Sequence, residues 1–476
     1  MRALYGLIAL LVIPLSISAI TKYPFPQAVK YVYGIKPSNI SNDRIQACYT
    51  DFVTRLYEEN TDKTMARIKW DTESMTVSEG IGYGMIIMVY MDNATNNTQV
   101  KFDKLWKYYN SFLNKNRLMN WKINGFTGVT TDGVNAATDA ELDVAIGLLE
   151  AFKQWGDEKY LNDAKVLIDT ISKVEINASG YIKPGDTWDL EKNCSYFCTG
   201  ALELFKKSTT FDWAKVIANS YSLMKKARNT TTGLIPNWCS EQGTPSTHGE
   251  RGQFTYDAIR IPWRLAWAYC WYGHEDAKTI CSDMASWITA KTSGDPAKIC
   301  DKYNLDGSSV TCYNNGTCVG CFASAGMVDA QHQTWLNAAY KRLQDTLVAV
   351  KEVYFSQSLK LLNLLLMSGN MPDFWNLPVE VASSQAFKSD GRAQAPVAPS
   401  SSWDARQGVL NFTTAPGVLS IDIYNSAGKR IGERYCGFSK DGRIAFPLKK
   451  RLQPGVYWLR LNTAAGSSVK KIITIY

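Results

Sequence analysis

The feature that most constrains the fold of this chain is a long region of helical periodicity. From about residue 40 to about residue 370, apolar residues recur every three or four positions, the spacing of a helix with one buried face. The pattern is clearest in segments 44–59, 101–113, 141–155, 213–227 and 258–271. The chain has 476 residues, more than one hydrophobic core usually supports. The sequence therefore predicts a large all-α domain, which we bound at residues 22–378, and at least one further unit.

The sequence changes character after this domain. Residues 379–405 are rich in Ala, Pro and Ser and lack periodicity, as a linker would. Short alternating runs separated by Gly and Asn then follow to the end of the chain. We expect residues 406–476 to form a small antiparallel β-sandwich.

The first residues predict export. Residues 1–19 combine a basic start, a short apolar stretch and small residues near Ala19, the pattern of a secretory signal peptide. Later apolar runs are shorter than the roughly 20 residues of a spanning helix, so we expect a secreted protein without a membrane span. Eleven cysteines suit an oxidising compartment, where disulfides are the natural interpretation, and their odd number leaves at least one unpaired.

The positive charge is concentrated in the tail. From Asp404 onward there are 12 Lys or Arg against 4 Asp or Glu, an excess that equals the formal charge of +8 of the whole chain. The helical domain is therefore nearly neutral. This distribution argues against nucleic acid as a partner, because a nucleic-acid binder carries its basic patch on its main folded domain.

Three acidic residues are predicted at helix starts. Thr76-x-x-Glu79 and Thr138-x-x-Glu141 fit the capping box, which places Glu79 and Asp139 in first helical turns, and Thr255 could cap a helix beginning near Asp257. These positions, together with Tyr196, are spaced by about 60 residues, the length of one helical hairpin. If alternate helices form a parallel inner ring, the acidic residues gather at one mouth of that ring.

Such a mouth has a plausible chemistry. Glycoside hydrolysis needs one carboxylic acid to protonate the leaving oxygen and a second carboxylate to activate water, with aromatic rings stacked on the sugars. The chain has only three histidines, which leaves few candidates for a histidine metal site or a Ser-His triad. Each residue alone could serve only its helix, since a first-turn carboxylate commonly interacts with the helix dipole. Their coincidence favours a catalytic cleft that needs no cofactor or metal.

Five motifs carry a resemblance to a known family. The segments TVSEGIGYGM, LMNWKI, ATDAELDVAIGLLEAF, NCSYF and YDAIRIPWR follow one another in the order and spacing of the family 8 glycoside hydrolases, over roughly residues 22–378. The resemblance implies an (α/α)6 barrel and an inverting mechanism acting on a β-glucan chain. We expect such an enzyme to be a monomer.

The resemblance also implies roles for individual residues. Glu79 matches the general acid, Asp257 the general base, and Asp139 the carboxylate that grips and distorts the sugar at the cleavage point. Supporting or substrate-binding positions are expected at Tyr196, Arg260, Trp121, Trp188 and Tyr256. A helix N-terminus favours an ionised carboxylate, so Glu79 needs desolvation or repulsion from Asp139 to remain protonated as an acid.

The sequence departs from the family pattern at two positions. Glu141 stands where the family usually has Asp, and we expect little effect from the longer side chain. Cys194 stands where the family has a loop-stiffening proline, and a disulfide to Cys198 or Cys239 could replace the lost rigidity.

The substrate is less constrained than the reaction. The ATD element favours an endoglucanase acting on cellulose or mixed-linkage β-glucan over a xylanase. A chitosanase is disfavoured because a cleft for a polycation should carry acidic excess. Two alternatives of another class are an inactive glycan-binding scaffold, which would lack Glu79 or Asp257, and a glycan lyase, which usually relies on Tyr, His and Arg.

Two further patterns leave alternatives open. Cys300, Cys312, Cys318 and Cys321 could form a zinc knuckle, although disulfides are favoured in an exported chain. The β-rich tail could bind carbohydrate, but its closing segment, residues 455–476, resembles the sorting domains of type IX secretion substrates. We favour sorting, which would make the secretion machinery a partner.

Overall fold

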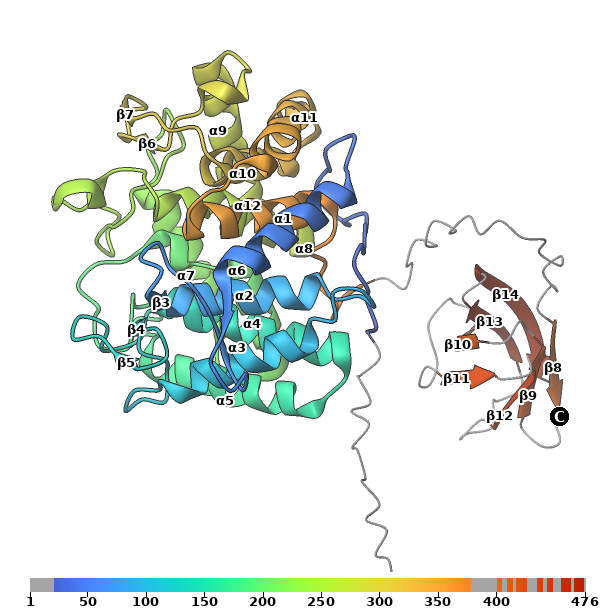
Figure 1. The fold of residues 1–476 in the computed structure, drawn as a ribbon. Helices are drawn as coiled ribbons and strands as arrows, with labels where there is room; N and C mark the ends of the chain where they lie inside the picture. Colours follow the sequence, from blue (N-terminus) through green and yellow to red (C-terminus); the bar gives the residue numbers. More distant parts are fainter. Residues whose placement is uncertain are drawn as a thin grey trace, which may run out of the picture. The chain divides into compact units, whose positions relative to one another are not determined.

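The computed structural model describes residues 21–377 and seven strands between residues 400 and 474 (Figure 1). The predicted signal peptide and most of the predicted linker lie outside these residues. Internal contacts divide the chain into two compact units, one ending at Ala382 and one beginning at Ser383. In the described part of the chain, no helix is both long and apolar enough to cross a bilayer.

Twelve α-helices of the first unit fall into two sets that alternate along the chain. Five of the even-numbered helices are buried along nearly their whole length, and α6 (Thr199–Ser208) is mostly buried as far as Phe205. The even-numbered helices are α2 (Ser78–Tyr90), α4 (Thr138–Trp155), α6, α8 (Ile261–Tyr272), α10 (Gly316–Ala325) and α12 (Tyr354–Ser368). Each contacts the next, and α12 contacts α2, so the six close into a ring. Their sequences are apolar on all sides because neighbouring helices surround them.

The odd-numbered helices cover the ring from outside. Each packs against an inner helix and buries a single face, which explains the helical periodicity seen in most of the segments that the sequence analysis singled out. They are α1 (Asn42–Leu56), α3 (Gln99–Ser111), α5 (Glu158–Val174), α7 (Trp213–Ala227), α9 (Glu275–Thr292) and α11 (Gln333–Lys341). This helix-rich arrangement is consistent with the expected (α/α)6 barrel.

Glycine permits the closest approach within the ring. A Cβ added at Gly82 of α2 would lie 2.8 Å from the Cβ of Asp143 and 3.2 Å from the carbonyl oxygen of Ala140, both on α4. A larger residue would therefore push the two helices apart. The glycines that follow Glu79 thus serve packing, and the close contact brings the N-terminal turns of α2 and α4 together.

Short elements fill the connections between the helices. Two-stranded and three-stranded antiparallel ribbons pair in the orders β1-β2, β3-β4-β5 and β6-β7. These strands are β1 (Tyr57–Glu59), β2 (Ala66–Ile68), β3 (Met75–Val77), β4 (Lys122–Asn124), β5 (Gly128–Val129), β6 (Lys302–Tyr303) and β7 (Ser309–Thr311). Short 3-10 helices are η1 (Cys194–Tyr196), η2 (Gly249–Gly252), η3 (Ala258–Arg260), η4 (Pro296–Lys298), η5 (Gly326–Val328), η6 (Ala330–His332) and η8 (Leu347–Ala349), and η7 (Arg342–Thr346) is a π-helix.

The second unit contains antiparallel strands, as the alternating pattern predicts. One sheet has the order β11-β10-β13-β14 and another the order β12-β9-β8. The strands are β8 (Ser400–Asp404), β9 (Val409–Thr413), β10 (Gly417–Asn425), β11 (Tyr435–Ser439), β12 (Arg443–Pro447), β13 (Gly455–Thr463) and β14 (Gly466–Thr474). Strand β8 lies within the segment assigned to the linker, because its serine-rich composition hides an extended chain.

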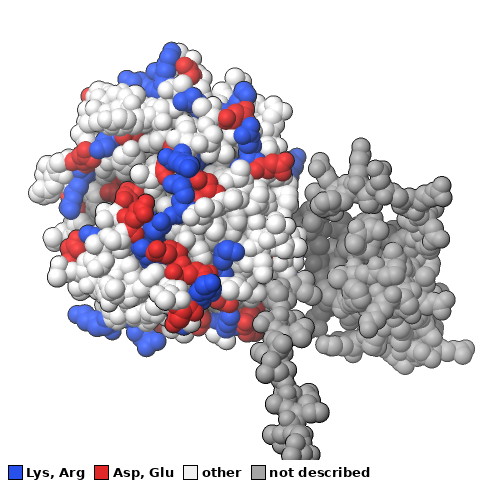
Figure 2. Space-filling model, viewed as in Figure 1, with Lys and Arg blue, Asp and Glu red and all other residues white. Residues whose placement is uncertain are grey.

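Charges on the face of the helical unit in Figure 2 are mixed. Lys and Arg side chains are interspersed with Asp and Glu side chains on that face. This mixture agrees with the nearly neutral helical domain derived from the sequence.

Candidate active site

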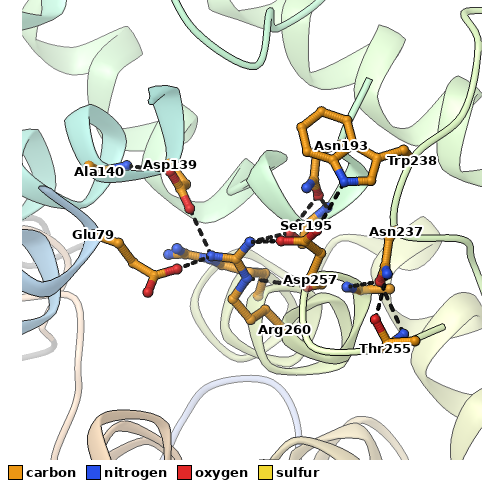
Figure 3. A network of polar contacts seen from close by, with 12 residues as sticks. Glu79, Asp139, Ala140, Asn193, Ser195, Asn237, Trp238, Thr255, Asp257 and Arg260 are labelled. Atoms are coloured by element: carbon orange, nitrogen blue, oxygen red, sulfur yellow. Dashed lines mark hydrogen bonds and ion pairs between the residues drawn. The ribbon is translucent and has the colours of Figure 1, made fainter. Parts of the chain in front are cut away.

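One buried arginine organises the predicted acidic residues. Arg260 ends η3, and its side chain is only 1% exposed. Its Nη1 atom donates to Glu79 Oε2 at 2.5 Å and to Asp139 Oδ2 at 2.7 Å, while Nη2 lies 3.2 Å from Asp257 Oδ1 (Figure 3). Three carboxylates from α2, α4 and the start of η3 therefore share one guanidinium. The N-terminal ends of inner helices do converge, as the 60-residue spacing predicts.

The helix start at Glu79 differs from the predicted capping box. Helix α2 begins at Ser78 after Val77, and Thr76 belongs to β3, where its hydroxyl donates to the carbonyl of Ile68 at 3.1 Å. The prediction that Thr76 caps this helix is wrong, because a strand continues to the helix start. Glu79 is in the first turn as expected, and its carboxylate faces Arg260.

The other two predicted caps are also wrong. Helix α4 begins at Thr138 itself, so Thr138 is a helical residue and Ala137 occupies the cap position. At η3, the side chain of Asn237 accepts from the backbone N–H groups of Thr255 and Ala258 at 3.0 and 2.9 Å. Asn237, 18 residues before Thr255, thus provides the cap that was expected from the Thr255 side chain. Sequence spacing could not reveal this long-range cap.

The three carboxylates differ in their exposure. The side chain of Asp139 is 4% exposed, that of Glu79 is 18% exposed, and that of Asp257 is 37% exposed. The second oxygen of Asp257 accepts from the indole N–H of Trp238 at 3.0 Å. Asp257 is therefore the carboxylate most open to water, and both of its oxygens are held in place.

The distance between Glu79 and Asp257 is limited by their common partner. Both contact terminal nitrogens of one rigid guanidinium, so their facing oxygens are at most about 8 Å apart. This upper limit lies within the range of about 6.5 to 9.5 Å that separates the two carboxyl groups of inverting glycosidases.

Burial and mutual repulsion raise the pKa values of two carboxyl groups in this cluster. Desolvation is the main cause that raises the pKa of Glu79 to about 7, with further contributions from Asp139 and Asp257. Arg260 and the hydroxyl of Tyr354 oppose the shift. Desolvation likewise raises the pKa of Asp139, against the stabilising effect of Arg260. The opposing influence that Glu79 was expected to need is thus present before any substrate covers the site.

Aromatic rings line one side of the cluster. The ring of Tyr196 lies 5.4 Å from the Arg260 guanidinium carbon, and its centroid is 6.2 Å from that of Trp238. Trp188 packs against Trp238 at 4.7 Å. Two of the predicted aromatic residues, Tyr196 and Trp188, are therefore connected to the carboxylate network.

The other two predicted aromatic residues make contacts of their own away from this network. The indole of Trp121 donates to the carbonyl of Asp132, and the hydroxyl of Tyr256 donates to Asp301 at 2.9 Å. Their partners are loop residues outside the carboxylate cluster, so the structure leaves the predicted roles of Trp121 and Tyr256 as predictions.

Sequence reasoning missed three residues that hold the network. Tyr354, the first residue of α12, donates to Glu79 Oε1 at 2.8 Å. Ser195 accepts from Arg260 Nη2 at 2.9 Å, and Trp238 binds Asp257. Ser195 lies inside the NCSYF motif and could have been found there. Tyr354 and Trp238 lie in segments without a motif, and only the tertiary fold brings them to the site.

The cysteines are less cross-linked than the sequence suggested. Cys300 and Cys312 form a disulfide, which confirms the preference for disulfides at that pair, while Cys318 and Cys321 are buried thiols. Within the described ranges, no group of three or more His, Cys, Asp or Glu side chains could hold a metal ion, so the zinc-knuckle alternative finds no support there. Cys194 is also a thiol, and Cys198 contacts Arg264 at 3.5 Å, so neither proposed bond is present.

The closed ring of paired helices, with carboxylates gathered around one arginine at the helix starts, agrees with the glycoside hydrolase class that the sequence motifs resemble. The family model for glycosyl hydrolases family 8 matches residues 61–369, and the chain belongs to this family. A second model, the secretion system C-terminal sorting domain, matches residues 406–475.

Relatives agree with this assignment. Endoglucanase 2 of Ruminiclostridium josui is 34% identical over 393 residues, covering 78% of this chain and 82% of that protein. Beta-glucanase of Niallia circulans is 31% identical over 392 residues, covering 76% and 95%. The apo structure of a beta-1,3-1,4-glucanase from Paenibacillus sp. X4 is 29% identical, with a TM-score of 0.70 over 74% of this chain and 99% of that one. The structure of Rex8A from Paenibacillus barcinonensis complexed with xylose, at 19% identity and a TM-score of 0.58 over 70% of this chain and 93% of that one, has the same fold.

Proposed function

We propose that this enzyme is a secreted endo-β-1,4-glucanase that hydrolyses cellulose or mixed-linkage β-glucan with inversion at an (α/α)6 barrel. The observation that carries the proposal is the sharing of Arg260 by Glu79, Asp139 and Asp257. The names of its relatives, which include endoglucanases and a beta-1,3-1,4-glucanase, support a β-glucan substrate.

Glu79 is the general acid. Arg260 can only donate, so it keeps Glu79 Oε2 as an acceptor and the acidic proton belongs on Oε1. Tyr354 donates to that same oxygen in the free enzyme and so opposes its protonation. When a glucan binds, the glycosidic oxygen takes the proton from Oε1 as the bond to the sugar carbon breaks.

Asp257 is the general base. It is the most exposed of the three carboxylates, and Arg260 and Trp238 orient its two oxygens. Asp257 takes a proton from a water that attacks the anomeric carbon on the face opposite the leaving oxygen, which inverts the configuration. Each turnover consumes one water and leaves one new reducing end and one free hydroxyl.

The remaining residues bind the sugar chain or orient the reacting groups. Asp139, held almost entirely out of solvent, binds and distorts the sugar at the cleavage point, and Tyr196 and Arg260 position the water and the base. Trp121, Trp188 and Tyr256 are proposed to contact sugar rings further along the cleft.

Reducing-end release tests this proposal. Purified enzyme and its Glu79→Gln variant are assayed on carboxymethylcellulose, barley β-glucan, xylan and chitosan, and the anomer released first is identified by proton NMR. We expect activity on the two glucans, lost by at least about 1000-fold in the variant, with the α-anomer appearing first. Activity only on xylan or chitosan would contradict the substrate assignment. A β-anomer would contradict inversion, and binding without hydrolysis would indicate an inactive scaffold.

We further propose that residues 406–476 direct export, in line with the sorting-domain match. A variant lacking these residues should hydrolyse glucan normally in a cell extract but fail to reach the medium of its native host. Loss of glucan binding instead would favour a carbohydrate-binding role for this unit.

A further inference from the structure

Two buried thiols face each other beside the candidate active site. The Sγ atoms of Cys194 in η1 and Cys239 in the loop after α7 are 3.8 Å apart, although the residues are 45 positions apart in the chain. Their exposed fractions are 2% and 0%. A disulfide needs an S–S distance of about 2.05 Å, so the sulfurs must approach by less than 2 Å.

The backbone around the pair is already fixed. Lys192 and Cys239 exchange two backbone hydrogen bonds of 2.8 and 3.0 Å, as directly paired residues of antiparallel strands do. On the other side, Trp238 accepts from Ser246 at 2.9 Å and donates to Arg251 at 2.8 Å. Both segments are therefore held in register where the two sulfurs face each other.

We propose that Cys194 and Cys239 are a disulfide site, closed by exchange with a small-molecule or protein disulfide. One thiolate attacks a sulfur of the oxidant and releases the first thiol, and the second cysteine then displaces the remaining thiol from the mixed disulfide. The two cysteines lose two electrons and two protons, and the oxidant is reduced to two thiols. The exchange itself needs only a disulfide oxidant. The proposed export matters only because it would expose the protein to such an oxidant in its natural setting.

The bond would join two segments that contact the carboxylate network. Ser195, next to Cys194, accepts from Arg260, and Trp238, next to Cys239, donates to Asp257. A covalent link between their neighbours restricts how far these two segments can separate. It also closes a loop of 45 residues, which reduces the freedom of the unfolded chain.

Peptide mapping tests the bond directly. The purified full-length protein is equilibrated with oxidised glutathione, alkylated after unfolding and digested without reduction, and its peptides are identified by mass spectrometry. We expect a peptide linking Cys194 to Cys239, also in a Cys198→Ser variant that removes the other thiol of this loop. The known pair Cys300–Cys312 serves as the internal standard. Alkylated Cys194 and Cys239 beside an intact Cys300–Cys312 bond, or a bond from Cys194 to Cys198, would overturn the proposal.

Thermal unfolding tests the consequence. Treatment with oxidised glutathione should raise the unfolding temperature of the wild-type protein by several degrees and leave that of a Cys194→Ser/Cys239→Ser variant unchanged. An equal rise in both proteins would place the stabilising bond elsewhere and contradict the assignment. This measurement does not depend on the substrate, so it separates failure of the disulfide from failure of the proposed glucanase activity.

Discussion

The candidate site gathers more negative charge than its arginine can neutralise. Three carboxylates surround Arg260, so the cluster has an excess of two negative charges if all are ionised. Retaining one proton lowers this excess, and Glu79 holds it because burial raises its pKa to about 7. Burial, together with repulsion from the neighbouring carboxylates, thus supplies the protonated acid that the reaction needs.

The alkaline side of the pH profile should report the proton on Glu79. Since the acid must be protonated, kcat/KM should fall as the pH rises above about 7. Tyr354→Phe removes a hydrogen bond that lowers the pKa of Glu79, so this fall should move to higher pH. Measurement of kcat/KM on a soluble β-glucan between pH 5 and 9 checks the shift. A fall at lower pH in the variant would contradict the role of Tyr354.

Trp238 should affect catalysis by orienting the carboxylate of Asp257. Trp238→Phe keeps an aromatic ring but removes the indole N–H that binds Asp257 Oδ2. A hydrogen bond to a charged acceptor contributes about 1.5–3 kcal/mol, so kcat should fall roughly 10- to 100-fold. Steady-state kinetics measures the loss. The matched control is Trp188→Phe, which alters the neighbouring ring without touching Asp257 and should raise KM more than it lowers kcat. Equal effects on kcat would argue against positioning by Trp238.

One helical turn below the site, a second ion pair joins α4 to α8, the helix that directly follows η3. Asp143 of α4 and Arg264 of α8 follow Asp139 and Arg260 by four residues each, and their side chains are 0% and 2% exposed. Arg264 donates to both oxygens of Asp143. This pair therefore ties α4 to α8 one helical turn away from Asp139 and Arg260.

Breaking this buried pair should destabilise the helical unit. Asp143→Asn leaves the Arg264 charge without its partner, which costs about 3–5 kcal/mol. Urea unfolding followed by tryptophan fluorescence measures the loss. Asp169→Asn, whose partner Lys173 is exposed, is the control and should change stability by less than about 0.5 kcal/mol. A similar small change in both variants would show that the buried pair does not hold the helices.

The sequence predicted the helices and strands better than it predicted the side-chain contacts between them. Segment 213–227 was expected to be helical and coincides with α7, because an amphipathic outer helix displays its period plainly. Glu79, Asp139, Asp257 and Arg260 could be found from motifs at helix starts. The capping assignments failed because β3 and Asn237 provide tertiary alternatives to a local cap. Trp238 was not predictable, since its role arises from a loop that folds back over η3.

Buried carboxyl groups should set the pH dependence of stability for the whole helical unit. Burial raises the pKa of Glu175 to about 8 and that of Glu141 well above its usual range. Glu141, which was expected to behave like a shorter Asp, is fully buried and accepts from Tyr109 at 3.1 Å. Between the unfolded and folded pKa values, the folded chain holds protons that the unfolded chain releases, so the free energy of unfolding falls as the pH rises.

The free energy of unfolding should therefore decrease from pH 5 to pH 8, by up to about 1.4 kcal/mol per pH unit for each such group. Glu175→Gln keeps the shape but cannot ionise, so its stability should decline less and exceed that of the wild-type protein at pH 8. Urea unfolding at each pH checks this, with most tryptophans in the helical unit as the probe. The three histidines of the chain provide few competing titrations in this range. A Glu175→Gln variant that declines as steeply as the wild-type protein would show that Glu175 is already ionised in the folded state.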